Sequence, residues 1–194
     1  MATVVVPFRS NDPKRRLGAH RAELAAAMLA DVLEAAAAVG PVFVVAPETP
    51  ALPAGATHVP DPKRGQGAAV RAALDAAAAT GAPEPYLVVN ADLPCVTTRD
   101  LLALAGAVPD GGLALAAAAD GTTNALALSH PELFEPVYGP GSAARFAALG
   151  ESRVLDAPNL ADDVDTTGDL QRLSARVGAH TRLALDALCL EPAA

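Results

Sequence analysis

Aromatic residues and cysteines are scarce in this chain of 194 residues. Phe, Tyr and Trp together supply 3% of the sequence, so Ala, Val and Leu must build the core from the 52% of residues that are hydrophobic. The two cysteines, Cys95 and Cys189, stand far apart and match no metal-binding or redox spacing. Their spacing argues against a thiol-based site or a zinc site built from cysteines, and we expect reduced thiols in a cytoplasmic protein.

Positive charge is also in deficit, with 14 Lys and Arg against 22 Asp and Glu and a net charge of -8. A general nucleic-acid-binding protein carries a basic face, so this balance argues against a nucleic-acid partner. Apolar runs fall short of the roughly 18 uncharged residues that a membrane span requires, and Arg9 comes too early for a signal peptide. We therefore expect a cytoplasmic protein without a membrane segment.

Apolar runs of strand length alternate with helical patterns through the first half of the chain. Strands are expected at residues 3–8, 42–46 and 86–90, with helices near 20–39, 65–80 and 97–105. Later patterns predict strands near 113–118, 125–128 and 153–155 and helices near 142–149, 167–175 and 180–188. The alternation predicts an α/β protein whose parallel sheet carries helices on both faces, in one domain spanning residues 1–194.

Two aspartates far apart in the sequence stand at positions suited to one metal site. Asp92 comes just after the apolar run 86–90, and Asp165 ends an acidic segment, 162–165, before an expected helix. Ligands of α/β proteins bind at the carboxyl ends of parallel strands, and carboxylates suit Mg²⁺, which substrate phosphates commonly share. Either acid can instead cap a helix, and Asp163 can join the site because alternate residues of an extended segment face one side.

The loop after the first expected strand concentrates positive charge in an otherwise acidic chain. It contains Arg9, Lys14, Arg15 and Arg16. Cations grouped in this way can hold a triphosphate and stabilise the charge on leaving pyrophosphate. The alternative is a solvated basic loop, and the missing glycines exclude a Walker A motif.

Two glycine-rich stretches offer backbone N–H groups to an anionic ligand. Gly65 and Gly67 flank Gln66 before an expected helix, whose N-terminus favours negative charge. Residues 139–141 form a second glycine-rich turn, and such turns can bind anions through successive N–H groups. The short polar side chains that we group with it are Thr122, Thr123, Asn124 and Ser142. Each stretch can equally be a plain turn followed by a helix cap.

Taken in order, these segments resemble the 2-phospho-L-lactate / phosphoenolpyruvate guanylyltransferase family of coenzyme F-420 biosynthesis. The family's N-terminal pattern, Pro-(Val/Phe)-Lys and then Ala-Lys-(Ser/Thr)-Arg-Leu, is similar to residues 7–9 and 13–17. Its Asp-Leu-Pro matches residues 92–94, and its Gly-Thr-Asn-Ala-Leu resembles residues 122–126. Its Phe-Gly-Pro-(Gly/Asp)-Ser matches residues 138–142, and its Asp-(Ile/Val)-Asp-Thr-Pro-x-Asp-Leu matches residues 163–170. The resemblance covers most of the chain.

The resemblance implies a three-layer nucleotidyltransferase fold, Rossmann-like and of the glycosyltransferase-A type, with a mixed, mostly parallel sheet. It implies transfer of GMP from GTP to a small phosphorylated carboxylic acid, with release of pyrophosphate. Asp92 and Asp165 would hold Mg²⁺ and form the catalytic set with Lys14 and Arg16. The nucleotide-binding residues that it implies are Pro7, Arg9, Lys14, Arg16, Gly65, Gln66, Gly67 and Asn90. The acceptor-binding residues that it implies are Thr123, Asn124, Gly139 and Ser142.

Two departures from the family pattern concern the nucleotide site. Gly65-Gln-Gly67 stands where the family often has Gly-Leu-Asn, and Arg9 replaces the usual Lys. The acceptor stays open among phosphoenolpyruvate, which the sequence composition favours, 2-phospho-L-lactate and 3-phosphoglycerate. The alternatives are a molybdenum-cofactor guanylyltransferase, whose glycine-rich opening loop this chain lacks, and a non-catalytic nucleotide-binding protein on the same fold. The Ala-rich helices leave room for a homodimer.

Overall fold

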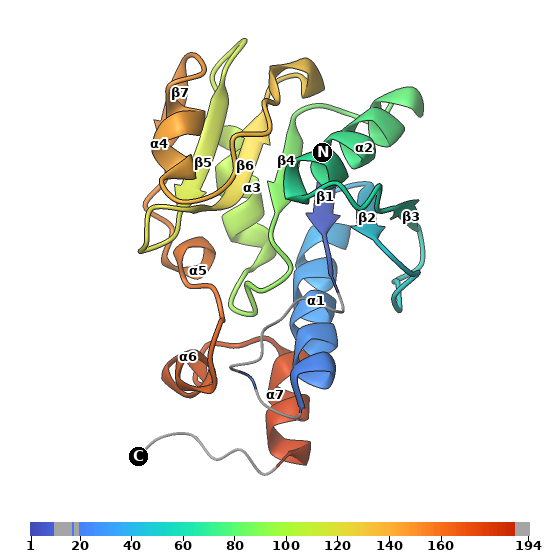
Figure 1. Cartoon of the computed structure of the whole chain (residues 1–194), viewed down its shortest axis with the longest axis vertical. Helices are drawn as coiled ribbons and strands as arrows, with labels where there is room; N and C mark the ends of the chain where they lie inside the picture. The colour runs from blue at the N-terminus through green and yellow to red at the C-terminus, as the bar shows by residue number, and fades with distance from the viewer. Residues whose placement is uncertain (10–16, 18–19, 189–194) are drawn as a thin grey trace.

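A computed structural model of the chain describes residues 1–9, 17 and 20–188, which fold around a seven-stranded sheet (Figure 1). The strands are β1 Thr3–Pro7, β2 Val42–Ala46, β3 Ala56–Pro60, β4 Tyr86–Val89, β5 Leu113–Ala117, β6 Thr123–Leu128 and β7 Ser152–Val154. Their order across the sheet is β3-β2-β1-β4-β6-β5-β7. β6 runs antiparallel to its neighbours β4 and β5, whereas the other paired strands are parallel. The prediction of a mixed, mostly parallel sheet is confirmed.

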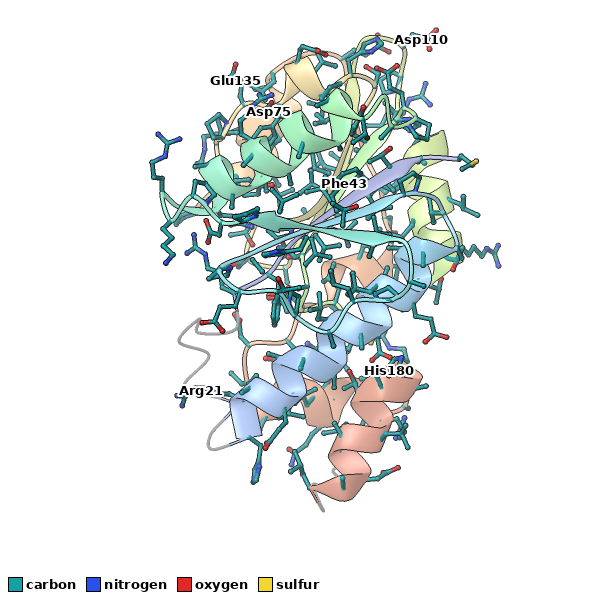
Figure 2. All side chains as sticks on the ribbon, turned by 90° about the vertical axis from the view of Figure 1, so that its right-hand side faces the viewer. Arg21, Phe43, Asp75, Asp110, Glu135 and His180 are labelled. Atoms are coloured by element: carbon teal, nitrogen blue, oxygen red, sulfur yellow. The ribbon has the colours of Figure 1, made fainter. Side chains whose placement is uncertain are left out.

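Helices cover both faces of this sheet, and Figure 2 shows α2 on one side of it and α1 on the other. The helices are α1 Arg21–Ala37, α2 Gln66–Ala79, α3 Thr98–Gly106, α4 Ser142–Ala147, α5 Pro158–Ala161, α6 Thr167–Leu173 and α7 Ala179–Ala187, with a 3₁₀ turn, η2, at Pro131–Leu133. α1, α3 and α5 share a core with one face, and α2 and α4 with the other. Among the described residues, no helix has the length and apolar character needed to cross a bilayer.

Alternation of side chains along the strands divides the core between the two faces. In β1, Val4 and Val6 belong to the cluster that contains α1 and α3, whereas Val5 belongs to the cluster that contains α2. Phe43 of β2 lies between the sheet and α2 (Figure 2). Because the central strands are buried on both faces, their sequences are continuous apolar runs, which made them easy to predict.

A third hydrophobic cluster joins the C-terminal helices to α1, at the end of the molecule away from the sheet (Figure 1). Leu173 of α6 and Leu185 of α7 pack there with Leu24 and Met28 of α1. Cys95 belongs to the same cluster as a buried free thiol, and burial raises its pKa. Cys189 lies outside the described residues.

A buried aspartate fixes α7 against α1. Asp31 is 4% exposed, and its two carboxylate oxygens accept the backbone N–H groups of His180 and Thr181, each at 2.9 Å. These N–H groups belong to the first turn of α7 and have no partner within the helix, so Asp31 acts as a cap supplied by another helix. Gly178 permits the approach, because a Cβ at that position would lie 2.3 Å from Asp31 Oδ1.

Candidate active site

A pocket opens where the carboxyl ends of β1, β2, β3 and β4 meet. Its lining includes five residues that the sequence analysis singles out, namely Pro7, Arg9, Gln66, Asn90 and Asp92. β1 and β4 are parallel neighbours, so the segments that follow them lie at the same edge of the sheet. Ends of separate strands and the first turn of α2 therefore converge on one site.

Side-chain amides fix the polar lining of this pocket. Gln66 Nε2 donates to Asn90 Oδ1 at 3.1 Å, and Asn90 Nδ2 donates to the Thr123 carbonyl oxygen at 3.3 Å. Gly65 precedes Gln66 with a φ of 95°, a backbone conformation that favours glycine. These contacts join α2, β4 and β6 at the rim of the pocket.

Gly67 is required by packing within the protein. A Cβ at Gly67 would lie 2.4 Å from Pro136 Cβ, so a larger residue would force α2 away from the segment around Pro136. From the sequence alone, Gly67 is expected to let the backbone come close to a ligand. Gly67 does not belong to the pocket lining drawn from the described residues, and its role toward a nucleotide stays a prediction.

The basic loop of the sequence analysis contributes Arg9 to the described part of the pocket. Its Nε stands 3.6 Å from Asp61 Oδ2, and the Asp61 side chain is 4% exposed. Asp61 Oδ1 also accepts the N–H of Lys63 at 2.8 Å, which shapes the loop between β3 and α2. Lys14, Arg15 and Arg16 lie outside the described residues.

Sequence reasoning misses two charged residues of this lining, Asp61 and Arg21. Asp61 directly follows β3, so its position at the carboxyl end of a parallel strand was an available signal. Arg21 begins α1 (Figure 2), and it lines the pocket with Ala25 and Met28 at helical spacing. That spacing could have identified the residues of one helix face, but it does not distinguish a face toward a pocket from a face toward the core.

Three aspartates gather beside the pocket. Asp92, Asp163 and Asp165 each offer a carboxylate oxygen, and these oxygens lie within 4.8 Å of one another. The backbone N–H of Val164 donates to the carbonyl oxygen of Asp92 at 3.1 Å, which holds the acidic segment against the loop after β4. The geometry brings Asp92 and Asp165 together, as the sequence analysis expected, and it adds Asp163.

The electrostatics of this cluster favour a bound cation. Burial raises the pKa of Asp163, the charges of Asp92 and Asp165 raise it further, and a hydrogen bond from Asn124 acts in the opposite direction. Carboxylates this close repel one another unless a positive charge offsets them. Their hard oxygen atoms are the donors that Mg²⁺ prefers. The three residues are therefore chemically suited to hold a divalent cation.

The four residues expected to bind the acceptor lie on β6 and around the start of α4. The buried hydroxyls of Thr123 and Ser142 share a hydrogen bond of 3.0 Å. Gly139 has a φ of 109°, and the guanidinium of Arg145 donates to the carbonyl oxygens of Val137, Tyr138 and Pro140 around it. Asn124 donates to Asp163 Oδ1 at 3.2 Å. Thr123 thus connects this region to Asn90 of the pocket. Asn124 connects it to the acid cluster formed by Asp92, Asp163 and Asp165.

The known proteins that this chain resembles in sequence are nucleotidyltransferases. The profile of the MobA-like NTP transferase domain family matches residues 15–157. The chain is 37% identical to the phosphoenolpyruvate guanylyltransferase of Sphaerobacter thermophilus, over 93% of this chain and 98% of that protein. It is 34% identical to the 2-phospho-L-lactate guanylyltransferase of Natrialba magadii, over 86% of this chain and 80% of that protein.

Solved structures share the fold at low sequence identity. A putative nucleotide-diphospho-sugar transferase from Desulfovibrio desulfuricans superimposes with a TM-score of 0.70 at 16% identity and covers 97% of each chain. The 2-C-methyl-D-erythritol 4-phosphate cytidylyltransferase of Thermus thermophilus gives a TM-score of 0.61 at 17% identity, over 89% of this chain and 96% of that one. These likenesses confirm the three-layer nucleotidyltransferase fold expected from the sequence.

Proposed function

Because the chain belongs to the family of phosphoenolpyruvate and 2-phospho-L-lactate guanylyltransferases, among the MobA-like NTP transferase domains, we propose that it is a guanylyltransferase. In the proposed reaction a small phosphorylated carboxylic acid receives GMP from GTP, and pyrophosphate is released. We assign the reaction to coenzyme F-420 biosynthesis in the cytoplasm. The observation that carries the proposal is the gathering of Asp92, Asp163 and Asp165 beside a pocket at the carboxyl ends of parallel strands.

The proposed chemistry is attack by a phosphate oxygen of the acceptor on the α-phosphorus of GTP. A new P–O bond joins the two substrates, and the bond between the α-phosphorus and the bridging oxygen of pyrophosphate breaks. The acceptor phosphate is already ionised near neutral pH, so the reaction needs no strong general base. The rate enhancement then comes from positioning and from neutralising charge.

Asp92 and Asp165 would hold Mg²⁺, with Asp163 as the third acid of the cluster. When bound, Mg²⁺ would neutralise phosphate charge and orient the two substrates. Arg9 at the pocket, with Lys14 and Arg16 from the same loop, would bind the β- and γ-phosphates. These cations would stabilise the charge that develops on pyrophosphate as it leaves.

The remaining residues divide between two substrate sites. Pro7, Gln66 and Asn90, with the Gly65–Gly67 backbone, would form the nucleotide site, where the linked amides offer fixed hydrogen-bonding groups. The hydroxyls of Thr123 and Ser142 and the glycine-rich turn at Gly139 would receive the phosphate and carboxylate of the acceptor. We favour phosphoenolpyruvate as the acceptor, the substrate in the name of the Sphaerobacter thermophilus relative.

A pyrophosphate-release assay tests the proposal. Purified protein is supplied with Mg²⁺ and GTP, with ATP and CTP as matched nucleotides, and with each of phosphoenolpyruvate, 2-phospho-L-lactate and 3-phosphoglycerate in turn. We expect release with GTP and phosphoenolpyruvate, and none when the acceptor is omitted. Release with only one of the other two acids would support the proposed guanylyl transfer but identify that acid, and not phosphoenolpyruvate, as the acceptor. No release with any acid, from protein that binds GTP, would contradict the proposal and favour a nucleotide-binding protein on the same fold.

A further inference from the structure

Asn124 makes the contacts that join the sheet to the acid cluster. It lies on β6 and is 3% exposed. Its Nδ2 donates to Asp163 Oδ1 at 3.2 Å and to the carbonyl oxygen of Ala161 at 3.2 Å. One side chain thus holds both the backbone and the carboxylate of the segment that carries Asp163 and Asp165.

The chemistry of the two partners fixes the orientation of this amide. A carboxylate oxygen and a carbonyl oxygen can only accept hydrogen bonds, so the NH₂ group and not the carbonyl oxygen of Asn124 must face them. An amide NH₂ has two N–H groups, and both are engaged here. In this arrangement the Asn124 side chain has no donor left for the phosphate or carboxylate of an acceptor.

Other contacts hold the same segment at Asp162 and Val164, the residues on either side of Asp163, whereas the Asp163 carboxylate is bound by Asn124. Asp162 is bound by Arg172, whose Nη1 donates to Asp162 Oδ1 at 2.8 Å, and by Arg176. The N–H of Val164 bonds to the carbonyl oxygen of Asp92. These contacts place the backbone on either side of Asp163. Because the partly buried Asp163 carboxylate lies within 4.8 Å of the carboxylate oxygens of Asp92 and Asp165, which repel it, a hydrogen-bond donor at this point is needed to hold its orientation.

We propose that Asn124 is a positioning residue, which holds the Asp163 carboxylate beside Asp92 and Asp165 so that the three acids act as one divalent-cation site. The inference deepens the proposed function and rests on it, since it takes the acid cluster to hold the cation. Hydrogen-bond partners behind metal-binding side chains orient those side chains, and their loss typically reduces metal affinity by about 10- to 100-fold.

The test is the affinity of the substrate-free protein for Mn²⁺, followed by electron paramagnetic resonance of the unbound ion. We expect Asn124→Ala to weaken Mn²⁺ binding by about 10-fold or more. The control is Thr3→Val, which removes a buried hydrogen bond of similar kind, Thr3 Oγ1 to the Pro83 carbonyl oxygen at 2.6 Å, at the opposite end of the parallel strands. Its Mn²⁺ affinity should equal that of the wild type.

Activity measurements separate positioning from acceptor binding. If Asn124 acts through the cation site, raised Mg²⁺ restores the turnover of Asn124→Ala, whereas raised acceptor concentration does not. If Asn124→Ala does not fold, Asn124→Ser, which keeps one donor, should show an intermediate loss of Mn²⁺ affinity. Unchanged Mn²⁺ affinity in the variant that folds would overturn the inference and leave the proposed function intact. A wild-type protein that binds no Mn²⁺ would overturn the cation site itself.

Discussion

Asp92 belongs to both the pocket lining and the cluster of three aspartates, so a change at this residue affects both parts of the site. We expect Asp92→Asn to slow pyrophosphate release at least about 100-fold, because the amide keeps the shape of the side chain but loses its negative charge. The thermal unfolding midpoint should stay close to that of the wild type. Asp110→Asn makes the same chemical change at an exposed residue far from the site (Figure 2) and should leave the rate unchanged. Full activity in Asp92→Asn would remove this residue from the cation site.

Single residues of the site differ in how much of their role the sequence reveals. Asn90 and Asp92 follow β4, which is apolar throughout. The change from apolar to polar residues marks the carboxyl end of the strand in the sequence, where a ligand is expected to bind. Asp61 follows β3, in which Val59 is the one buried residue, so this strand is weakly marked in the sequence and the signal that its end gives for Asp61 is easily overlooked. The sequence leaves undecided whether Asp163 belongs to the metal site, because only the folded structure shows which acids of an irregular segment face the same point.

Among the elements, α7 depends on the close approach of Gly178 to Asp31. We expect Gly178→Ala to lower the free energy of unfolding by about 2 kcal/mol, because the new Cβ would collide with a buried carboxylate. The φ of Gly178 is -66°, which alanine adopts freely, so the loss would come from the collision and not from backbone strain. Chemical denaturation provides the measurement. Gly150→Ala, where a Cβ meets nothing within 4 Å, is the matched control, and equal stability of the two variants would contradict the packing argument.

The pairing of Asp162 with Arg172 and Arg176 gives α6 and the acidic segment a stability that depends on pH. Burial acts to raise the pKa of Asp162, but hydrogen bonds from the two arginines hold it below its usual range. A carboxyl group with a lowered pKa stabilises the fold above its unfolded pKa of about 3.9 and loses that effect as the pH falls through its folded pKa.

We therefore expect the double variant Arg172→Gln, Arg176→Gln to be less stable than the wild type at pH 7. The difference between the two proteins in free energy of unfolding should shrink as the pH falls from about 4 through the lowered pKa of Asp162 in the folded wild type, below which Asp162 is protonated in both proteins. Urea denaturation across this pH range supplies the comparison. A difference that stays constant with pH would show that the arginines stabilise the fold through packing alone.

The elements that the sequence places least well are those around the site. β6 begins at Thr123, two residues before the strand expected from the sequence, because Thr123 and Asn124 are polar yet buried. Their side chains form hydrogen bonds with Ser142, Ala161 and Asp163, which are distant in sequence. Polar residues with such partners look like loop residues until the partners are known.

For the whole molecule, local patterns were sufficient to predict a mostly parallel sheet, most of its helices and the family, but not the short helix α5. The alternation of buried strands and helices implies a mostly parallel sheet, and ligands of such sheets gather at the carboxyl ends of the strands. Strand order was beyond local patterns, because insertion of β6 between β4 and β5 depends on pairing between distant segments. That insertion brings Asn124 of β6 to the segment that carries Asp163.

The most direct test of the central claim follows phosphorus through the reaction by ³¹P nuclear magnetic resonance, with protein, Mg²⁺, GTP and phosphoenolpyruvate in one sample. We expect the resonances of GTP and phosphoenolpyruvate to decline together, while signals of pyrophosphate and of a new diphosphate linkage between GMP and the acid rise in equal amounts. Inorganic phosphate with GDP, or pyrophosphate with free GMP and intact phosphoenolpyruvate, would contradict transfer of GMP to the acceptor.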